Sequence, residues 1–540
     1  MPAKLKGMTA RQRWTLIAAI LGSGIVFLDS TVVNVALPKI GRELPSTLFG
    51  VLEWQSYVYN GYLLTVSALL ILAGALNDFY GRKWMFTLGL VGFLVTSLLC
   101  GFAPNLELLV LFRVLQGVAG ALLVPGSLAL LTVTFSGEAQ GRAFGLWAAA
   151  SAATTILGPF VGGILVDSIS WRAAFLINVP LLLIALWATA RHVEESRAEG
   201  ASSRFDWLGA LVVAVAVGGL SFGTIYGQQR EWKDPIGFIL LGAGALATVA
   251  LPFLMTRRSN PLIPPELFRS RNFTVTNIST FLIYGSLYVV GYFLTLFVQG
   301  TVGFSAAAAG LAFIPSGLFL VFLSSRFGAL AGKHGPRLFM AIGPAIMTLG
   351  ILWYARIPAA TTSWLFTFGD PGTYLPPASF YADILPGALL FGLGLSILVA
   401  PLTTALMTSV PSRNSGVASA INNAISRVGP QLAGAVIFIA ITTSFYAGLH
   451  DRVPSLDPND PDVRKTYAPL NVSGPCVGNN VPCPPPAVQL AQAQRDASTD
   501  AFHLAMLIAA GLLAVGAAVN ALGIQNKPAP LPADAAGATA

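Results

Sequence analysis

Long apolar runs separated by short polar segments make up most of the chain. A helix needs about 20 apolar residues to cross the hydrocarbon core of a bilayer, and most of these runs reach that length. The pattern predicts an all-α integral membrane protein, with both ends of the chain on one side because the number of spans is even. The fourteen predicted spans lie near residues 14–36, 54–73, 84–103, 108–131, 142–165, 172–190, 207–226, 236–256, 274–299, 306–327, 338–354, 384–408, 416–443 and 501–524.

The second half of the chain weakly repeats the first. Gly74–Lys83 follows the second predicted span and matches Gly328–Arg337, which follows the tenth, at an offset of 254 residues. Gly158–Gly163 matches Gly429–Gly434 at an offset of 271, and an insertion in the loop at 355–383 explains the increase. Chance similarity of glycine-rich apolar segments is the alternative. A true repeat predicts two six-helix halves joined by two extra spans, an arrangement typical of transporters with a site between the halves.

The boundaries of these spans divide the chain into five segments. Residues 1–13 are the cytoplasmic N-terminus, 14–190 the N-terminal half, and 191–272 the linker with the two extra spans. The C-terminal half, 273–524, carries two long outer loops at 355–383 and 446–499. Residues 525–540 are predicted to be a disordered cytoplasmic tail.

Composition and charge agree with a membrane protein. Apolar residues make up 55% of the chain and charged residues 10%, against about 25% charged residues in soluble domains. The net charge of +8 comes from residues spread over short loops, which argues against a nucleic-acid-binding surface. With the N-terminus inside, 19 of the 31 Lys and Arg residues fall in cytoplasmic segments and 10 in outer segments. Because positive residues favour the cytoplasmic side, we predict a multi-pass protein of the plasma or inner membrane with cytoplasmic termini.

The sequence offers little for metal or cofactor chemistry. Its four histidines are far apart, so no metal site is predicted. The one Gly-Lys pair is followed by His334, so the chain has no phosphate-binding loop for ATP. The spans lack clustered catalytic side chains, and we predict no cofactor and no enzyme activity. A channel or receptor is a weaker alternative, because no repeated selectivity filter is visible.

Two of the three cysteines lie in the second outer loop. Cys476 and Cys483 are separated by six residues that include Pro482. The compartment outside the cytoplasm is usually oxidising, so a disulfide between them is predicted, with two free thiols as the alternative. Cys100 lies in an apolar span and is expected to pack there.

One carboxylate stands inside the first apolar run. Asp29 has no Lys or Arg within nine residues, and at about 1.5 Å per residue it lies roughly 22 Å along the helix from Trp14. A carboxylate at that depth is costly unless it is protonated, paired or reached by water. One interpretation is a proton-coupling group whose proton affinity changes between two conformations. The other is a structural aspartate fixed to a neighbouring helix, with Arg113 as the candidate partner.

Other polar residues also lie within the spans. Arg113 is about five residues into its span, so it is expected to face a cavity or a carboxylate, with snorkelling to the outer interface as the alternative. Arg427 forms a similar polar group with two asparagines. The tyrosines that open the second span either belong to an interfacial belt or line a cavity for flat, apolar or cationic compounds. The candidate cavity residues are Asn34, Tyr57, Tyr59, Asn60, Tyr62, Gln116, Asn422, Asn423 and Arg427.

Four motifs stand out: Leu28–Pro38, Gly74–Lys83, Arg113–Ala121 and Gly145–Gly163. Through them the chain resembles a known family, the fourteen-helix drug:proton antiporters of the major facilitator superfamily. Leu28–Pro38 (LDSTVVNVALP) resembles the first-helix motif of that group. Gly74–Lys83 (GALNDFYGRK) resembles the loop motif of the superfamily, with Phe79 where a basic residue is usual. Arg113–Ala121 (RVLQGVAGA) resembles the fourth-helix motif.

The fourth motif resembles the fifth-helix motif associated with antiporters. Thr154 stands where that motif usually has glycine. Small residues on one helix face let another helix approach closely, and a proline within the helix bends it. The residues of this motif are Gly145, Gly158, Pro159, Gly162 and Gly163.

The loop motif also has a physical role of its own. Gly74 and Gly81 permit a tight turn. Asp78 can pair with Arg82, with Lys83 or with a helix N-terminus. Such a clasp would hold one closed state and release another. The alternative is a solvated turn whose basic residues only fix the topology.

The resemblance implies a proton-coupled antiporter that exports small amphipathic compounds, typically in multidrug efflux. It also implies that Asp29 and Arg113 take part in proton coupling. An exporter of a lipid or native metabolite with the same mechanism is the alternative. The expected partners are the substrate, protons and the lipid bilayer, without nucleic acid; the need for a periplasmic or envelope adaptor is left open.

Overall fold

The computed structural model describes residues 8–45, 51–197, 205–229, 232, 234–258, 261–367, 369–411, 414–472 and 485–526. Apart from one isolated bridge between Ala468 and Asn471, the regular elements of these residues are all helical. The helices of the N-terminal half are α1 (Ala10–Glu43), α2 (Val51–Tyr80), α3 (Arg82–Gly101), α4 (Leu106–Thr134), α5 (Gly137–Ser168), α6 (Ala173–Leu176) and α7 (Asn178–His192). The linker contains α8 (Trp207–Gln229), α9 (Pro235–Arg257) and the 3₁₀ turn η2 (Pro265–Arg269). The C-terminal half contains α10 (Arg271–Phe297), the π-helical turn η3 (Val298–Val302), α11 (Ala306–Ala312), α12 (Ile314–His334), α13 (Arg337–Tyr354), the 3₁₀ turn η4 (Pro371–Thr373), α14 (Ala378–Asp383), α15 (Leu385–Thr408), α16 (Ser415–Arg452), α17 (Pro461–Thr466) and α18 (Pro485–Gly523).

The predicted all-α membrane architecture is confirmed. Within the described residues, thirteen helical stretches are long and apolar enough to cross a bilayer. The remaining predicted span, 142–165, corresponds to α5, a helix of 32 residues that is not among those thirteen. The helices therefore account for each of the fourteen predicted spans.

The outer loop predicted at 446–499 is shorter than expected. α16 and α18 both extend into it, and they are the longest helices of the described chain, at 38 and 39 residues. The extensions are held by packing, since Leu449 and Ala497 belong to the apolar core of the C-terminal half. Arg452 also pairs with Asp500 at 2.6 Å. Contacts between the two helices thus continue beyond the point where the apolar pattern of the sequence ends.

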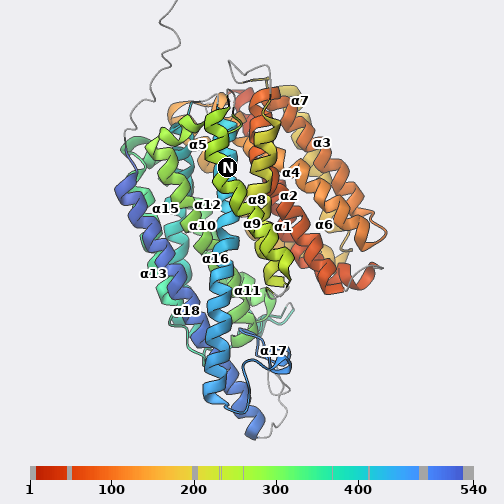
Figure 1. Cartoon of the computed structure of the whole chain (residues 1–540), viewed down its shortest axis with the longest axis vertical. Coiled ribbons are helices and arrows are strands. Elements are labelled where there is room, and N and C mark those ends of the chain that lie inside the picture. Colours follow the sequence, from red (N-terminus) through yellow and green to blue (C-terminus); the bar gives the residue numbers. More distant parts are fainter. Residues whose placement is uncertain are drawn as a thin grey trace, which may run out of the picture.

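The two halves lie side by side and contact each other directly, with the linker helices beside their junction. In Figure 1 the N-terminal helices (red to orange) occupy one side, the C-terminal helices (green to blue) the other, and α8 and α9 lie over the junction. α8 contacts α2 of one half and α16 of the other. Glycines bring α8 and α9 together, because a Cβ added to Gly219 would lie 2.8 Å from the Cα of Gly244.

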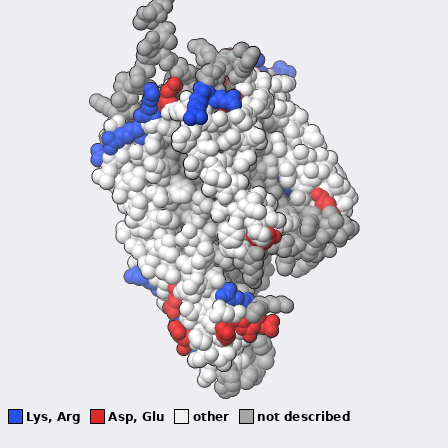
Figure 2. All heavy atoms as spheres, viewed as in Figure 1, with Lys and Arg blue, Asp and Glu red and all other residues white. Residues whose placement is uncertain are grey.

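Both ends of the described chain lie at one end of the bundle, which we call the terminal end. There Arg11, near the start of α1, pairs with Glu194 after α7 at 2.6 Å. In the other half, Arg271 at the start of α10 donates to the Gly523 carbonyl at the end of α18 at 2.8 Å. Figure 2 shows Lys and Arg gathered at the terminal end, charges of both signs at the opposite end, and a largely uncharged belt between. That belt has the character of a bilayer-facing surface.

Candidate functional site

A single carboxylate lies where several helices of the N-terminal half converge. Asp29 on α1 is fully buried, and Arg113 on α4 donates through Nη1 to its Oδ2. Its Oδ1 accepts from Gln116 Nε2 at 3.3 Å and from Asn178 Nδ2, at the start of α7, at 3.0 Å. Ser97 on α3 accepts from Gln116 Nε2 at 2.9 Å. Side chains of α4 and α7 thus bond to the carboxylate, Ser97 of α3 supports Gln116, and the charge of Asp29 is compensated where it lies.

Arg113 connects this network to α2. The side chain is fully buried, and its Nε donates to the Val58 carbonyl at 3.2 Å. Its guanidinium lies over the Tyr62 ring, 4.1 Å from the centroid, and the Tyr62 hydroxyl donates to the Val26 carbonyl at 3.0 Å. Arg113 Nη2 has no hydrogen-bond partner among the described residues. The structure therefore places Arg113 against a carboxylate rather than at the membrane interface.

Two members of the network were not predicted from the sequence. Asn178 lies beside a one-residue break in the sixth span, with α6 ending at Leu176 and α7 beginning at Asn178. Pro180 has no N–H with which to continue the helical ladder across this break. An asparagine two residues before a proline in an apolar span was a usable signal. Ser97 gave no such signal, because a single serine in a membrane span is common.

The loop motif joins the two halves at the terminal end. Asp78 Oδ1 accepts from Arg82 Nε at 3.1 Å and Nη2 at 2.9 Å. Its Oδ2 accepts from the backbone N–H of Val417, in the first turn of α16, at 3.1 Å. A Cβ added to Gly74 would lie 2.5 Å from the Gly416 carbonyl oxygen, so α2 and α16 touch backbone to backbone. The carboxylate thus sits at a helix N-terminus, where free N–H groups and the helix dipole favour an anion.

The turn itself is fixed by glycine and by a cap. Gly81 has φ +118°, a conformation that disfavours other residues. The backbone N–H groups of Lys83 and Trp84 both donate to the Glu195 carboxylate at 3.0 Å. The Lys83 side chain donates to the Ala190 carbonyl at 3.3 Å, so it is not part of the Asp78 clasp.

The matching turn in the C-terminal half repeats this geometry without the clasp. Gly335 has φ +87°, and the following N–H of Arg337 donates to Asn526 Oδ1 at 3.1 Å, as Lys83 does to Glu195. The position that corresponds to Asp78 is Gly332, which has no carboxylate to offer. A shared backbone geometry therefore supports the internal repeat, while the ion pair belongs to one half alone.

The halves also meet between α5 and α12. A Cβ added to Gly145 would lie 3.0 Å from the Cα of Ser325, and one added to Gly141 would lie 3.8 Å from the Gly328 carbonyl oxygen. Both contacts fall near the start of α5, on the side of the terminal end. Together with the Asp78 contact, they hold the two halves together at that end.

Further along α5, glycines face α1 close to Asp29. A Cβ added to Gly158 would overlap the Thr31 side chain, lying 2.8 Å from its Cβ. A Cβ added to Gly162 would lie 3.0 Å from Val32 Cγ1. The next position, Gly163, has nothing within 4 Å. The glycines at 158 and 162 are thus required for close helix contact, and the one at 163 is not.

Gly158→Ala is expected to destabilise the protein, whereas Gly163→Ala is not. The added methyl must displace Thr31, whose hydroxyl is bonded to the Leu28 carbonyl at 2.9 Å. Overpacking of this kind costs about 1–3 kcal/mol, which exceeds the gain of up to about 1 kcal/mol from replacing a helical glycine. Thermal unfolding midpoints in detergent would measure both. Equal midpoints for the two variants would show that the α1–α5 contact is not tight.

The remaining candidate cavity residues fall into different environments. Asn422 is buried inside the C-terminal half and donates to Thr280 Oγ1 at 2.8 Å, so it ties α16 to α10. Asn423 donates to the Ser419 carbonyl of its own helix at 2.9 Å. Asn34 is exposed, and Tyr57, Tyr59, Asn60 and Arg427 are half-buried.

Tyr59 and Arg427 come together between the halves. Tyr59 on α2 interacts electrostatically with Arg113 of its own half and with Arg427 and Tyr288 of the C-terminal half. Arg427 itself has no hydrogen bond or ion pair to any residue that the structure describes. Among the candidates from the sequence, Tyr59 and Arg427 thus interact across the junction, and Tyr62 also interacts with Arg427.

Three predicted features lie outside the described residues. They are the cysteine pair Cys476 and Cys483, residues 527–540 of the predicted tail, and the side chain of Pro159, whose backbone belongs to α5. The disulfide stays a prediction.

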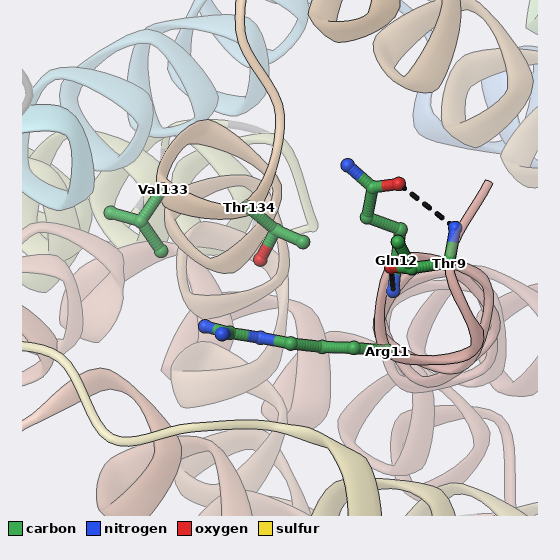
Figure 3. Close-up of a pocket in the computed structure, with 5 residues that line it drawn as sticks. All are labelled: Thr9, Arg11, Gln12, Val133 and Thr134. Atoms are coloured by element: carbon green, nitrogen blue, oxygen red, sulfur yellow. Dashed lines mark hydrogen bonds between the residues drawn. The ribbon is translucent and has the colours of Figure 1, made fainter.

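One pocket of about 430 Å³ lies at the terminal end, between the start of α1 and the end of α4. Figure 3 shows Arg11 extending from α1 toward Thr134, beside the hydrogen bonds between Thr9 and Gln12 that cap the helix. None of the residues predicted for the site lines it.

Comparisons with known proteins agree on a family. The model of the Major Facilitator Superfamily matches residues 19–434. The chain is 31% identical to multidrug resistance protein Stp of Mycobacterium tuberculosis, over 85% of this chain and 81% of Stp. It is 32% identical to the methylenomycin A resistance protein of Bacillus subtilis, over 80% of this chain and 89% of the relative. It is 31% identical to the tetracenomycin C resistance and export protein of Streptomyces glaucescens, over 81% of this chain and 77% of the relative.

A solved structure supports the same fold. The human organic anion transporter MFSD10 (TETRAN) aligns with a TM-score of 0.54 at 15% identity, covering 94% of this chain and all of that one. Helix content, paired halves and sequence similarity therefore lead to one conclusion: the chain is a multi-pass membrane transporter of the major facilitator superfamily.

Proposed function

We propose that the protein is a proton-coupled antiporter that exports small amphipathic compounds. The observation that carries the proposal is the position of Asp29. Of the buried carboxylates that the structure describes, Asp78 and Asp206 lie at helix ends, and only Asp29 lies in the middle of a span. An ionisable group at that depth is costly and points to function. The resistance and export roles in the names of the relatives support the direction of transport.

A physical route connects Asp29 to the contact between the halves. Protonation of Asp29 removes the charge that holds Arg113. Arg113 in turn holds α2 through the Val58 carbonyl and the Tyr62 ring. The far end of α2 carries Asp78, which is bonded to α16. A change at Asp29 can therefore shift α2 and alter the stability of the Asp78 contact, which is how one group biases a two-state equilibrium.

The arrangement of the halves fits one state of such a cycle. The contacts of Gly74 with Gly416 and of Gly145 with Ser325 close the terminal end. We assign this end to the cytoplasm, because Lys and Arg gather there. The protein would then be in its form closed to the cytoplasm, and uptake of substrate requires Asp78 to leave α16.

Reporter fusions test this orientation. A fusion at Arg197, after α7 at the terminal end, is expected to report the cytoplasm. A fusion at Arg464, in α17 at the opposite end, is expected to report the outside. Reports from the same side would contradict the fourteen-span arrangement.

Transport by purified protein in liposomes tests the coupling. With the membrane voltage clamped at zero by potassium and valinomycin, an imposed pH gradient is expected to drive substrate against its concentration gradient. A chemically diverse panel of amphipathic compounds should be screened beside a lipid-flux assay, because the lipid exporter is the alternative. If no compound responds to the pH gradient, proton antiport is refuted.

A further inference from the structure

The charges in the membrane interior are unbalanced. The membrane-spanning parts of the C-terminal helices contain no Asp or Glu; the acidic residues of that half lie in outer loops or in the outer ends of α14, α16 and α18. In the N-terminal half, the one carboxylate in mid-span is Asp29, which Arg113 already neutralises. Arg427 is left as a cation without a counter-ion among the described residues.

Arg427 is placed where a substrate would pass. It lies twelve residues after Ser415, the first residue of α16, which is about 18 Å along the helix at 1.5 Å per residue. It interacts electrostatically with Tyr59 of α2 and with Tyr288 of α10, so it faces the junction of the two halves. Tyr288 is 51% exposed, so its side chain is not enclosed by the packed helices. One turn further on, Gln431 Oε1 is buried without a hydrogen-bond partner.

We propose that Arg427 binds an anionic group of the substrate, so that the preferred substrates are amphipathic anions, such as carboxylates, sulfonates or phenolates on a flat apolar body. The proposal rests on the efflux function above and names its substrate class. An unpaired arginine within a span is costly, and a passing anion would supply the missing charge.

The chemistry of the surrounding side chains fits such a substrate. The planar guanidinium offers paired donors that match a carboxylate or sulfonate better than a lysine would. The rings of Tyr59 and Tyr288 offer flat apolar surface with a hydroxyl at the edge. A cationic compound would find no free carboxylate here and would meet the like charge of Arg427. This differs from the cationic compounds that the tyrosines alone suggested.

Two dyes with the same ring system test the proposal. Fluorescein is an anionic xanthene and rhodamine 6G a cationic one. Their binding to the purified full-length protein in phosphatidylcholine nanodiscs can be followed by fluorescence anisotropy. Fluorescein is expected to bind at least about tenfold more tightly, the size of one charge-assisted hydrogen bond. Equal or tighter binding of rhodamine 6G, or no binding of either dye, would overturn the proposal.

Variants assign the effect to one side chain. Arg427→Gln is expected to weaken fluorescein binding by about tenfold or more and to leave rhodamine 6G unweakened. Arg427→Lys keeps the charge and should retain part of the affinity. Arg452→Gln, at the outer end of the same helix, is the matched control and should change neither dye. Fluorescein binding that is unchanged in Arg427→Gln would refute the assignment. Should that variant not fold, Arg427→Lys decides. A partial loss of fluorescein affinity with unchanged rhodamine 6G binding would agree with the proposal, and unchanged fluorescein affinity or a loss of rhodamine 6G binding alone would contradict it.

Two further measurements separate related explanations. Phosphatidylglycerol added to the nanodiscs tests whether Arg427 binds a lipid headgroup. Unchanged fluorescein affinity supports a soluble anion as the ligand. Displacement of fluorescein by the lipid would overturn the proposal of a soluble anion. The binding assay needs no proton gradient, so it is independent of the transport test. Arg427-dependent fluorescein binding in a protein that ignores the pH gradient would refute antiport and support the anion site.

Discussion

Asp29→Asn is expected to reduce pH-driven efflux to background in a protein that still inserts and folds. The introduced amide can still accept from Arg113, but it cannot take up or release a proton. Folding is expected because the neutral form of residue 29 occurs in every cycle of the proposed antiporter. Arg113 also keeps its bonds to the Val58 carbonyl at 3.2 Å and to Gln116 Oε1 at 2.7 Å. The liposome assay with clamped voltage measures the effect.

Related variants make the result interpretable. Asp29→Glu retains a titratable group and should keep some transport. Ser30→Ala is the matched control, since the Ser30 hydroxyl donates only to the Phe27 carbonyl of its own helix at 2.7 Å. Efflux at the wild-type rate in a well-folded Asp29→Asn protein would refute coupling through this residue. Loss of expression of Asp29→Asn would instead favour the structural interpretation.

Asp78→Asn is expected to open the terminal end and to slow transport strongly. The substitution removes the ion pair with Arg82, which is only 2% exposed, and weakens the bond to the Val417 N–H. Loss of one charge-assisted contact of about 1.5–3 kcal/mol shifts a two-state equilibrium by roughly 10- to 150-fold. Lys83→Gln is the matched control, because the Lys83 side chain donates to the Ala190 carbonyl outside the clasp.

Spin labels at the terminal end can measure this shift. Arg191 and Lys333 are exposed, and they lie at that end in the N-terminal and C-terminal halves, respectively. Distances between labels at these positions should broaden to longer values in Asp78→Asn and stay unchanged in Lys83→Gln. An unchanged distance and transport rate in Asp78→Asn would refute the gating role of Asp78. The turn would then be a solvated turn whose basic residues only fix the topology.

The sequence predicted the fold and part of the candidate site for one physical reason. A polar residue in a long apolar run is costly, so the sequence alone indicates Asp29, Arg113 and Gln116 as candidates. Their partners could not be derived, because pairing depends on how helices pack. Asn178 donates to Asp29 across 149 residues of sequence.

The contacts of Asp78 were also only partly predictable from the sequence. The sequence indicated that Asp78 could pair with Arg82 or with a helix N-terminus, and both contacts are present. It could not say that the helix would be α16, 339 residues away. The ends of α16 and α18 were also missed, because contacts such as Arg452 with Asp500 extend helices where hydropathy no longer does.

The lone cation at Arg427 has an electrical consequence. A monoanion that leaves the cell while one proton enters moves two charges in the same direction across the membrane. A potential of 100 mV, negative inside, then adds about 4.6 kcal/mol to the driving force, at about 2.3 kcal/mol per charge. That is enough for more than a thousandfold concentration ratio, at about 1.4 kcal/mol for each factor of ten. A cation exchanged for one proton would move no net charge, so membrane voltage would not drive its export. By selecting anions, Arg427 would allow membrane voltage to drive efflux even where the two sides have the same pH.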